Sequence, residues 1–468
     1  MNKYIPTIGL EIHAELKTGS KMFCACKNDP DANKPNTNIC PICLGHPGTL
    51  PVLNMEAIKH VLRVGTAVKG SLADFTEWDR KNYFYPDIPK GYQISQYKYP
   101  LVTGGELSGI AIERIHLEED TAQSTHDIHE KSLVNFNRSG VPLMELVTKP
   151  VIHDAETAMN FAKELQLLLR TLNVGEANME KGEMRVEANI SVASEDDTRV
   201  GKFGTKTEVK NLNSFRSVGR AIAYEVERQV KLIEDREKVL QETRGWDDTL
   251  NETYSQRSKE SSHDYRYFPE PDIPKLKLSE IKEFSSEILK NEIPELSNSK
   301  RDRYKKDFGM TDKEVAVLID SPALSNYYES VVSNFRGDPL HIKLAKNYLL
   351  NETGVMLVPP KNFSELISMI AAGEISSRGA KDILALLIKT PGSSPRMIAE
   401  KNNLLQKSDA SSLLPAIDEI ISANPKVVTE YKAGKTASLQ FLIGQAMKVT
   451  KGSANPEVLR RLITEKLS

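Results

Sequence analysis

Four cysteines lie close together near the start of the chain. Cys24 and Cys26 form a C-x-C pair, and Cys40 and Cys43 form a C-x2-C pair after a loop rich in Asn, Asp, Pro and Lys. In a reducing compartment, clustered pairs are more often metal ligands than disulfides. Four thiolates suit tetrahedral zinc and leave no open position for a catalytic water. The pattern predicts a structural zinc knuckle, with two fortuitous pairs or a redox role as the alternatives.

A second candidate site consists of Glu11, His13 and Glu15. These residues alternate with apolar residues between Ile8 and Leu16, and such period-2 alternation indicates a half-buried strand. Their side chains then share the polar face of that strand. Two carboxylates and an imidazole on one face could bind a divalent cation, although a solvated strand face would show the same pattern.

An acidic run supplies further carboxylates. Glu118, Glu119 and Asp120 follow His116 at the end of an alternating segment. Three adjacent acids repel one another, so we expect a cation or an arginine beside them. Oxygen ligands with one imidazole favour Mg²⁺ or Mn²⁺ over zinc. An acidic surface loop is the alternative interpretation.

Aromatic and basic residues are concentrated in two segments. Six Tyr or Phe residues lie between Tyr83 and Tyr99, with Lys81 and Lys90 nearby, and the run Tyr265-Arg266-Tyr267-Phe268-Pro269 is similar. Such segments can stack on nucleobases or on the end of a nucleic acid. The alternative is a loop whose rings pack on the domain core.

Residues that could bind phosphate are scattered along the chain. Glu208, Lys210 and Asn211 lie on expected polar strand faces, and such residues could hold phosphate oxygens beside a metal. Each by itself is more typical of a structural role.

The triplet Gly434-Lys435-Thr436 lacks the upstream glycine of a P-loop, because position 429 is Thr. Any use of a nucleotide must therefore follow a less common design.

A mixed scaffold is needed to position these residues. Alternation over 8–16 and over 184–192 predicts two strands, and we expect helices after the N-cap candidate Asp154 and after Asn213. From about Ile293 helical patterns replace the alternation, and the polar stretch 406–412 is typical of a linker. We predict an α+β catalytic domain over residues 1–292, with a mixed or antiparallel sheet and the zinc knuckle at 24–43. An all-α domain over 293–405 and a small all-α tail domain over 406–468 follow.

Composition narrows the class of protein. The chain has 468 residues, of which 39% are hydrophobic and 27% charged, with a formal net charge of −2. This is enough apolar material for folded cores. The net charge excludes a uniformly basic nucleic-acid binder.

The tail 426–468 carries eight Lys/Arg against three Asp/Glu, which suits contact with a phosphate backbone. No apolar run reaches the ~18 residues of a membrane span, and no secretory pattern begins the chain, so we expect a cytoplasmic protein without membrane contact.

Six runs together carry a resemblance to one family. They are GLEIHAELK at 9–17, KNYFYPD at 81–87, HLEED at 116–120, NRSGVPL at 137–143, EVKNLNS at 208–214 and DYRYFPEPD at 264–272. With these runs the chain closely resembles the B subunits of aspartyl/glutamyl-tRNA(Asn/Gln) amidotransferases, and the resemblance spans the whole chain. It implies a cradle-shaped α+β catalytic domain, a helical domain and a tail domain that contacts tRNA.

The resemblance also implies an activity. Proteins of this family act on tRNA mischarged with Glu or Asp: ATP phosphorylates the side-chain carboxylate, and ammonia then displaces phosphate to leave Gln or Asn. The ammonia comes from glutamine through a separate amidase (the A subunit), and the small C subunit holds the two larger chains together in a heterotrimer. The implied cofactors are ATP, Mg²⁺ and a structural Zn²⁺. No glutaminase nucleophile is expected in this chain.

Roles for individual residues follow from the resemblance, because Mg²⁺ must shield the anionic oxygens that approach one another. The expected Mg²⁺ ligands are Glu11, His13, Glu118, Glu119 and Asp120. The expected catalytic residues are His13, Glu11, Lys81 and Glu119. Contacts with ATP phosphates or with the acceptor end of the tRNA are expected from Lys81, Arg185, Lys210 and Arg266. Glu187 and Glu208 are candidates for the exit of an ammonia tunnel.

Two other classes of function stay open. A non-catalytic tRNA-binding protein with a zinc knuckle explains the cysteines, the aromatic residues and the tail, but leaves the Glu and His strand faces unexplained. A stand-alone metal hydrolase would act without partner chains. The sequence also leaves open whether Glu-tRNA(Gln), Asp-tRNA(Asn) or both are substrates.

Overall fold

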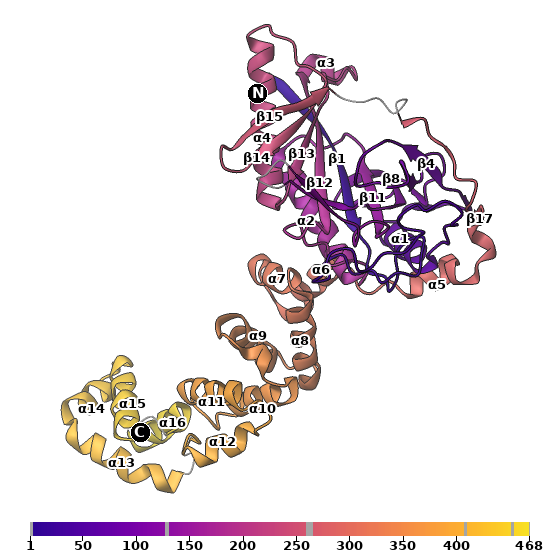
Figure 1. Ribbon diagram of the computed structural model, residues 1–468. Coiled ribbons are helices and arrows are strands. Elements are labelled where there is room, and N and C mark those ends of the chain that lie inside the picture. The colour runs from indigo at the N-terminus through magenta and orange to yellow at the C-terminus, as the bar shows by residue number, and fades with distance from the viewer. Residues whose placement is uncertain (1–2, 127–130, 259–264, 407–409, 451–453, 468) are drawn as a thin grey trace. The chain divides into compact units, whose positions relative to one another are not determined.

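The computed structural model describes residues 3–126, 131–258, 265–406, 410–450 and 454–467 (Figure 1). The chain separates into two units, Met1–Ser297 and Asn298–Ser468. All strands of the described residues lie in the first unit, and the second unit is helical. The predicted α+β fold followed by helices is therefore confirmed, whereas the division into three domains stays a prediction.

A ten-stranded sheet forms the centre of the first unit. Neighbouring strands are antiparallel, except for one parallel pair, β13 and β14. The order across the sheet is β15 (Glu252–Ser258), β14 (Glu242–Asp247), β13 (Thr207–Leu212), β12 (Met184–Ser194), β1 (Tyr4–Glu15), β11 (Pro142–Thr148), β8 (Ile110–Glu119), β6 (Val102–Thr103) and β2 (Ser71–Leu72), with β7 (Glu106–Leu107) paired to β8.

Three short sheets contain the remaining strands among the described residues of this unit. One has the order β16 (Phe268–Pro269), β4 (Asp79–Asn82), β5 (Tyr92–Ser95), and the others pair β9 (Gln123–His126) with β10 (Ser132–Asn135) and β3 (Phe75–Thr76) with β17 (Leu276–Lys277). Strand β4 is antiparallel to both of its neighbours. The two aromatic segments of the sequence therefore meet on either side of β4.

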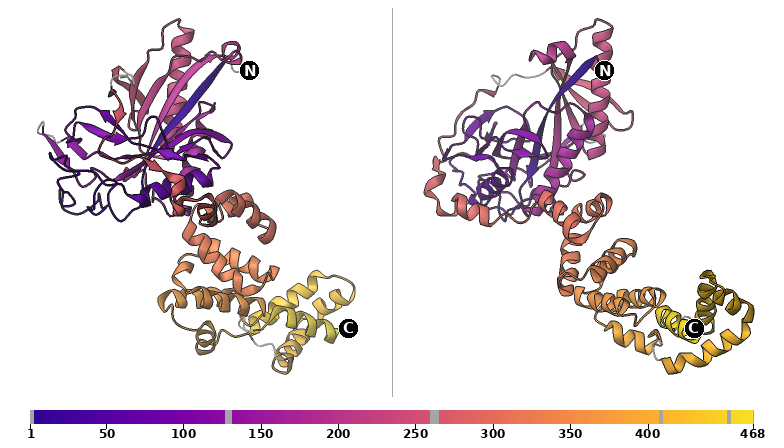
Figure 2. Two further views of the ribbon diagram at one scale, coloured as in Figure 1. Left: turned by 90° about the vertical axis from the view of Figure 1, so that its right-hand side faces the viewer. Right: turned by 180° about the vertical axis from the view of Figure 1, so that it is seen from behind.

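Helices α2 (Ala155–Thr171) and α4 (Phe215–Glu234) lie side by side on one face of the large sheet (Figures 1 and 2). Asp154 caps α2 by accepting a hydrogen bond from the backbone N–H of Thr157, and Ser214 caps α4 in the same way through Ser217. Both helices begin where the sequence predicts them. The other helices of the unit are α1 (Met55–Ala67), α3 (Glu195–Arg199) and α5 (Ser286–Asn291).

The period-2 pattern of β1 divides its side chains between the two faces of the sheet. Ile8, Leu10 and Ile12 are fully buried in the core with Phe161 of α2. Each such side chain stabilises the fold by roughly 1.5–3 kcal/mol relative to exposure. The alternating polar residues of β1 consequently lie on the opposite face, as the sequence predicts.

The second unit is built from α6 (Ser297–Phe308), α7 (Asp312–Ile319), α8 (Pro322–Val332), α9 (Pro339–Asn351), α10 (Pro360–Ala371), α11 (Ser377–Lys389), α12 (Pro395–Lys401), α13 (Ala410–Ala423), α14 (Pro425–Lys432), α15 (Ala437–Val449) and α16 (Pro456–Leu467). Several begin with proline, which fits the first turn of a helix. Leu413, Leu442 and Leu459 belong to a separate core formed by the last helices. None of the helices among the described residues combines the length and hydropathy that a bilayer span requires.

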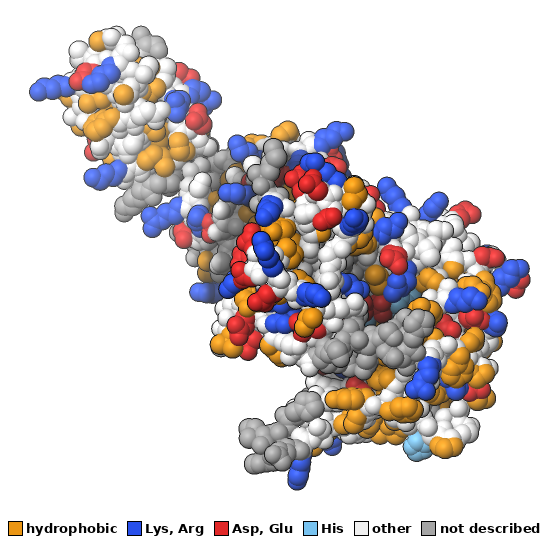
Figure 3. Space-filling view, turned by 90° about the horizontal axis from the view of Figure 1, so that it is seen from above, with side chains coloured by type: hydrophobic (Ala, Val, Ile, Leu, Met, Phe, Trp, Pro, Cys, Tyr) orange, Lys and Arg blue, Asp and Glu red, His pale blue; other side chains and the backbone are white. Residues whose placement is uncertain are grey.

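Charged side chains of both signs are interspersed over the surface seen in Figure 3. This mixture agrees with the formal net charge of −2. A nucleic-acid partner would therefore meet local basic clusters on this face rather than a uniformly basic surface.

We expect Phe161→Ala to lower the free energy of unfolding of the first unit by about 3–5 kcal/mol, because removal of a fully buried ring leaves a cavity under α2. Both tryptophans, Trp78 and Trp246, are buried in this unit, so their fluorescence in a urea titration follows it. Phe203→Leu changes an exposed position and is the control. It should unfold at the same urea concentration as the wild type. A free energy of unfolding equal to that of the wild type in the Phe161→Ala variant would contradict the packing described.

Candidate active site on the polar face of the sheet

Strand register brings charged residues of four strands into one row. His13 of β1 lies opposite Arg185 of β12 and Glu145 of β11, and Glu145 lies opposite His116 of β8. All four occupy the polar face, because side chains alternate along each strand. Directly opposed residues of antiparallel strands have Cβ atoms about 4.5–5.5 Å apart, so neighbours in the row are within contact distance.

Glu145 is the centre of this row. Its Oε2 is 3.4 Å from Nε2 of His13 and 3.2 Å from Nε2 of His116, and its side chain is buried. Glu118 lies beside it, with one oxygen 3.9 Å from Nε2 of His13 and the other 3.8 Å from Nε2 of His116. The Ser95 hydroxyl donates a hydrogen bond of 2.8 Å to Glu118. Two carboxylates and two imidazoles thus form one cluster, here termed the polar cluster: His13, His116, Glu118 and Glu145.

The carboxylates change the protonation of both imidazoles. Burial by itself would lower the pKa of His13, but its hydrogen bond to Glu145 and the nearby carboxylate charges outweigh burial and raise that pKa to about 9. Burial is likewise outweighed at His116, where Glu145 and Glu118 raise the pKa to about 9. Burial opposes ionisation of Glu145, yet the two histidines hold its pKa well below its ordinary range. Both imidazoles of the polar cluster are therefore protonated beside ionised carboxylates, and a metal ion that binds them must displace these protons.

A second group of carboxylates adjoins the polar cluster. Glu11 lies opposite Glu187 of β12, and ligand oxygens of Glu11, Glu187 and Glu208 all lie within 4.8 Å of one another. Lys210 places its Nζ 2.7 Å from Oε2 of Glu187 and 4.0 Å from Oε1 of Glu208. Burial and the charge of Glu145 raise the pKa of Glu11. Lys210 is thus already bound to carboxylates of the chain.

Lys81 approaches the polar cluster from β4. Its Nζ is 5.0 Å from the ring centroid of Tyr265, and no ion pair or hydrogen bond links it to a carboxylate among the described residues. Burial would lower the pKa of Lys81, but the charges of Glu118 and Glu145 hold it above its ordinary value. A charged, half-buried ammonium that no carboxylate of the described residues pairs with is available to an anionic substrate.

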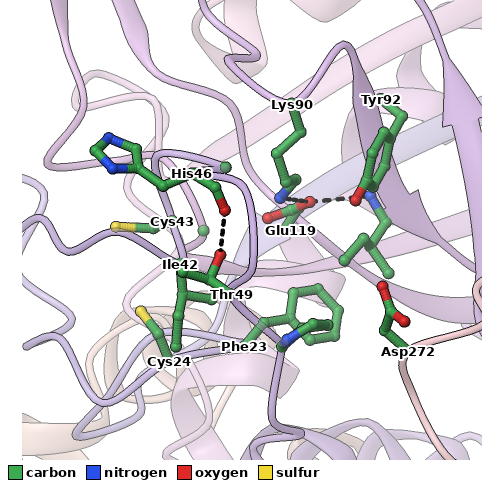
Figure 4. Close-up of a pocket in the computed structure, with 14 residues that line it drawn as sticks. Phe23, Cys24, Ile42, Cys43, His46, Thr49, Lys90, Tyr92, Glu119 and Asp272 are labelled. Carbon is green, nitrogen blue, oxygen red and sulfur yellow. Dashed lines mark hydrogen bonds and ion pairs between the residues drawn. The ribbon is translucent and has the colours of Figure 1, made fainter.

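Glu119 points away from the polar cluster, because successive side chains of β8 lie on opposite faces. It forms an ion pair with Lys90 and accepts a hydrogen bond of 2.9 Å from the backbone N–H of Ile94. Glu119 and Lys90 line a small cavity that also borders Cys24 and Cys43 (Figure 4). The structure therefore does not bring Glu119 to the expected metal site.

Asp120 follows β8 and binds arginines. Both of its carboxylate oxygens accept hydrogen bonds of 3.0 Å from Nη2 of Arg185, and Nε of Arg138 is 3.5 Å away. The charges of these arginines outweigh burial and lower the pKa of Asp120. The predicted arginine partner is thus found, and the burial of Glu118, Glu119 and Asp120 contradicts the surface-loop alternative. Asp120 and Arg185 thus hold each other at the end of the row, next to His13.

The four cysteines come together as a cluster. Their sulfur atoms all lie within 4.8 Å of one another, and Sγ of Cys40 is 3.9 Å from Sγ of Cys43. Sulfurs around a tetrahedral zinc stand roughly 3.8 Å apart, given Zn–S bonds of about 2.3 Å. A hydrogen bond with Cys24 and, among further causes, the charge of buried Lys21 lower the pKa of Cys43 to about 5. This cluster could bind a metal.

Of the five residues predicted to bind Mg²⁺, the structure brings together Glu11, His13 and Glu118. Sequence reasoning missed Glu145 as a member of this site and left His116 without a role. Glu145 could have been found as the single acid inside the apolar run 142–147, and His116 because it shares a strand face with Glu118.

Arg266, predicted to contact phosphate or the acceptor end, is exposed. Its backbone is left-handed, with φ of 44°, and its carbonyl accepts a hydrogen bond of 2.8 Å from the Asn82 amide. The side chain is therefore presented to solvent from a loop that is fixed to β4.

Comparison with known proteins places the chain in a family. Residues 6–282 match the model described as the GatB/GatE catalytic domain, and residues 329–467 match the model described as the GatB domain. The chain belongs to the GatB family. Every residue of the polar cluster lies within the matched catalytic domain, and the resemblance noted in the sequence is confirmed. GatB proteins are subunits of the glutamine-dependent tRNA amidotransferase, a ligase that forms C–N bonds.

Curated relatives of the chain are similar over their full lengths. The B subunit of the aspartyl/glutamyl-tRNA(Asn/Gln) amidotransferase from Thermodesulfovibrio yellowstonii is 43% identical over 479 residues, covering 98% of each chain. The protein of the same name from Caldicellulosiruptor bescii is 42% identical over 488 residues, covering 99% of each. The catalytic and helical parts of the GatB family are thus both represented in this chain.

We expect Asp120→Asn to lower the free energy of unfolding by about 2 kcal/mol, because two arginines lose their buried carboxylate. The figure is modest because the Arg185 side chain is 34% exposed. Urea titration followed by tryptophan fluorescence measures it, with the exposed Asp196→Asn as control. Wild-type stability combined with loss of metal binding would instead make Asp120 a metal ligand, as the sequence alone predicts.

Proposed function

We propose that the polar cluster activates the side-chain carboxylate of Glu or Asp esterified to tRNA, and that the activated group is amidated at the same place. The observation that carries this proposal is the meeting of two carboxylates and two imidazoles beside the half-buried ammonium of Lys81. Phosphoryl transfer to a carboxylate brings anionic oxygens together, so it needs fixed positive charge and metal-binding oxygens away from bulk water. The polar face supplies both kinds of group.

The donor atoms of this site fit a divalent cation. One ligand atom from each of Glu11, His13 and Glu145 lies within 4.8 Å of the others, and the same holds for His116, Glu118 and Glu145. Carboxylates are preferred by Mg²⁺, and the second imidazole makes Mn²⁺ an acceptable substitute. We therefore propose these five residues as the ligands of Mg²⁺. A bound ion would shield and orient the phosphate oxygens.

Lys81 is the residue we propose for direct contact with the substrate carboxylate or the transferred phosphoryl group. It retains its charge beside Glu118 and Glu145, and no ion pair or hydrogen bond links it to a carboxylate among the described residues. Arg185 and Lys210 already bind Asp120 and Glu187, so they serve as positioning residues for the polar face. The exposed Arg266 suits contact with the acceptor end of the tRNA.

The proposed reaction has two balanced steps. First, a carboxylate oxygen of the aminoacyl group attacks the γ-phosphorus of ATP, and ADP leaves with the electrons of the broken P–O bond. The lone pair of ammonia then attacks the acyl carbon, and the C–O bond to phosphate breaks. The departing phosphate takes up the proton that the new amide nitrogen loses. The products are Gln or Asn on the tRNA, ADP and phosphate.

Partners are part of this proposal. Ammonia is supplied by the separate amidase, the A subunit, through a sheltered passage, because protonated ammonia cannot attack the acyl phosphate. The small C subunit holds the two larger chains together. The basic residues of the tail suit contact with the tRNA backbone, and the reaction takes place in the cytoplasm.

The reconstituted heterotrimer should amidate mischarged tRNA with ATP, Mg²⁺ and glutamine. Glu145→Gln and Lys81→Met should each lower kcat at least about 100-fold, because each removes charge that acts on the reacting oxygens. Mass analysis of the amino acid released from Glu-tRNA(Gln) and from Asp-tRNA(Asn) measures product and decides between the substrates.

Glu113→Gln is the matched control, since Glu113 is an exposed acid of the same β8. Ammonium chloride in place of glutamine separates ammonia supply from transfer. Wild-type kcat in the folded Glu145 variant would refute the assignment of the site. Binding of tRNA without amidation by the complete heterotrimer would favour the non-catalytic alternative.

We also propose that the four cysteines bind a structural Zn²⁺ and take no part in the reaction. Protein purified without chelators should contain about one equivalent of zinc, because four thiolates form a closed tetrahedral set. Metal analysis measures this content, and Cys40→Ser should reduce it. Less than about half an equivalent in the wild type would refute the proposal.

A further inference from the structure

Two tyrosines form a stacked pair at the edge of the three-stranded sheet. The ring centroids of Tyr97 and Tyr267 are 4.5 Å apart and the ring planes differ by 13°. Tyr97 follows β5 and Tyr267 precedes β16, so the two rings come from segments on either side of β4. The Tyr97 side chain is 57% exposed. One ring of the pair therefore presents a face to solvent.

The position of Tyr97 is fixed by hydrogen bonds of its backbone. The N–H groups of Tyr97 and Lys98 donate to Oδ2 of Asp79 at 2.9 and 3.3 Å, and Asp79 is buried. Tyr267 is held by the pairing of β16 with β4. An exposed aromatic ring that is held in this way loses little conformational entropy when it binds a flat partner.

The stacked pair is continuous with the polar cluster. Tyr267 contacts Tyr265 edge to face, with centroids 6.1 Å apart, and Lys81 lies over the Tyr265 ring. Burial raises the pKa of Tyr267, and the charges of Glu118 and Glu145 raise it further. The series of rings thus starts beside the proposed reaction centre and ends at the surface with Tyr97.

Basic residues adjoin the exposed end of this series. Lys98 is exposed and follows Tyr97 directly, and Arg266 is exposed between the two tyrosines of the second segment. A flat aromatic face bordered by cations has the properties that single-stranded nucleic acid recognises, because bases stack and phosphates pair with the charges. A partner protein with an apolar surface would offer no negative charge to pair with these cations.

We propose that Tyr97 stacks on the terminal nucleobase of the 3′ end of tRNA and thereby positions the esterified amino acid at the polar cluster. This inference rests on the proposed function and adds to it a positioning residue for the substrate. Stacking tolerates any base, so the contact would select for an unpaired end rather than for a sequence.

The test uses the full chain and uncharged tRNA that carries 2-aminopurine in place of its terminal adenosine, without ATP. Stacking quenches the fluorescence of this base. We expect severalfold quenching with the wild type and with Tyr97→Phe, which keeps the ring, and little quenching with Tyr97→Leu. In the complete heterotrimer, Tyr97→Leu should raise KM for mischarged tRNA by about five- to tenfold.

Phe203→Leu is the matched control, because Phe203 is also an exposed aromatic residue, with 58% of its surface accessible. The inference would be overturned if the wild type and Tyr97→Leu quenched the 2-aminopurine fluorescence equally. It would also be overturned if neither protein quenched it. Weaker association of the partner chains with Tyr97→Leu at unchanged quenching would overturn it as well, since Tyr97 would then belong to a protein interface. Amidation without quenching refutes only this inference, whereas quenching without amidation refutes only the proposed function.

Discussion

Carboxylates can stay ionised side by side in a buried place only if positive charge is interleaved with them, and this constraint organises the polar face of the first unit. Arg185, His13, Glu145 and His116 lie in one row across four strands, where the carboxylate of Glu145 stands between the two imidazoles. This arrangement allows Glu145 to stay ionised in a buried position.

The two faces of the sheet have different roles: one packs in the core and stabilises the fold, and the other carries the polar cluster. Ile8, Leu10 and Ile12 bury their side chains in the core on one face, whereas the residues between them build the site on the other. A packed apolar face on the other side of the sheet holds the strands, and with them the polar cluster, in a fixed arrangement. The site is thus carried by strands rather than by loops.

Much of this architecture could be predicted from the sequence, because strand periodicity and helix caps are local signals. The alternation around Glu11 and His13 gave the correct strand and the correct face. Local signals do not show which strands become neighbours, so the sequence alone does not place Glu145 between His13 and His116. The run at Glu119 and Asp120 was grouped by adjacency in sequence, although alternation along a strand separates adjacent side chains. Whether the resulting site binds Mg²⁺ stays a prediction.

The end of β8 also restricts insertions and deletions in this part of the chain. Glu118 belongs to the polar cluster, and Glu119, one residue later, borders the cavity beside Cys24 and Cys43. Inserting or deleting a single residue between His116 and Asp120 would exchange the two faces and damage both places at once. We therefore expect natural and engineered variants of this segment to differ by substitution and to keep its length.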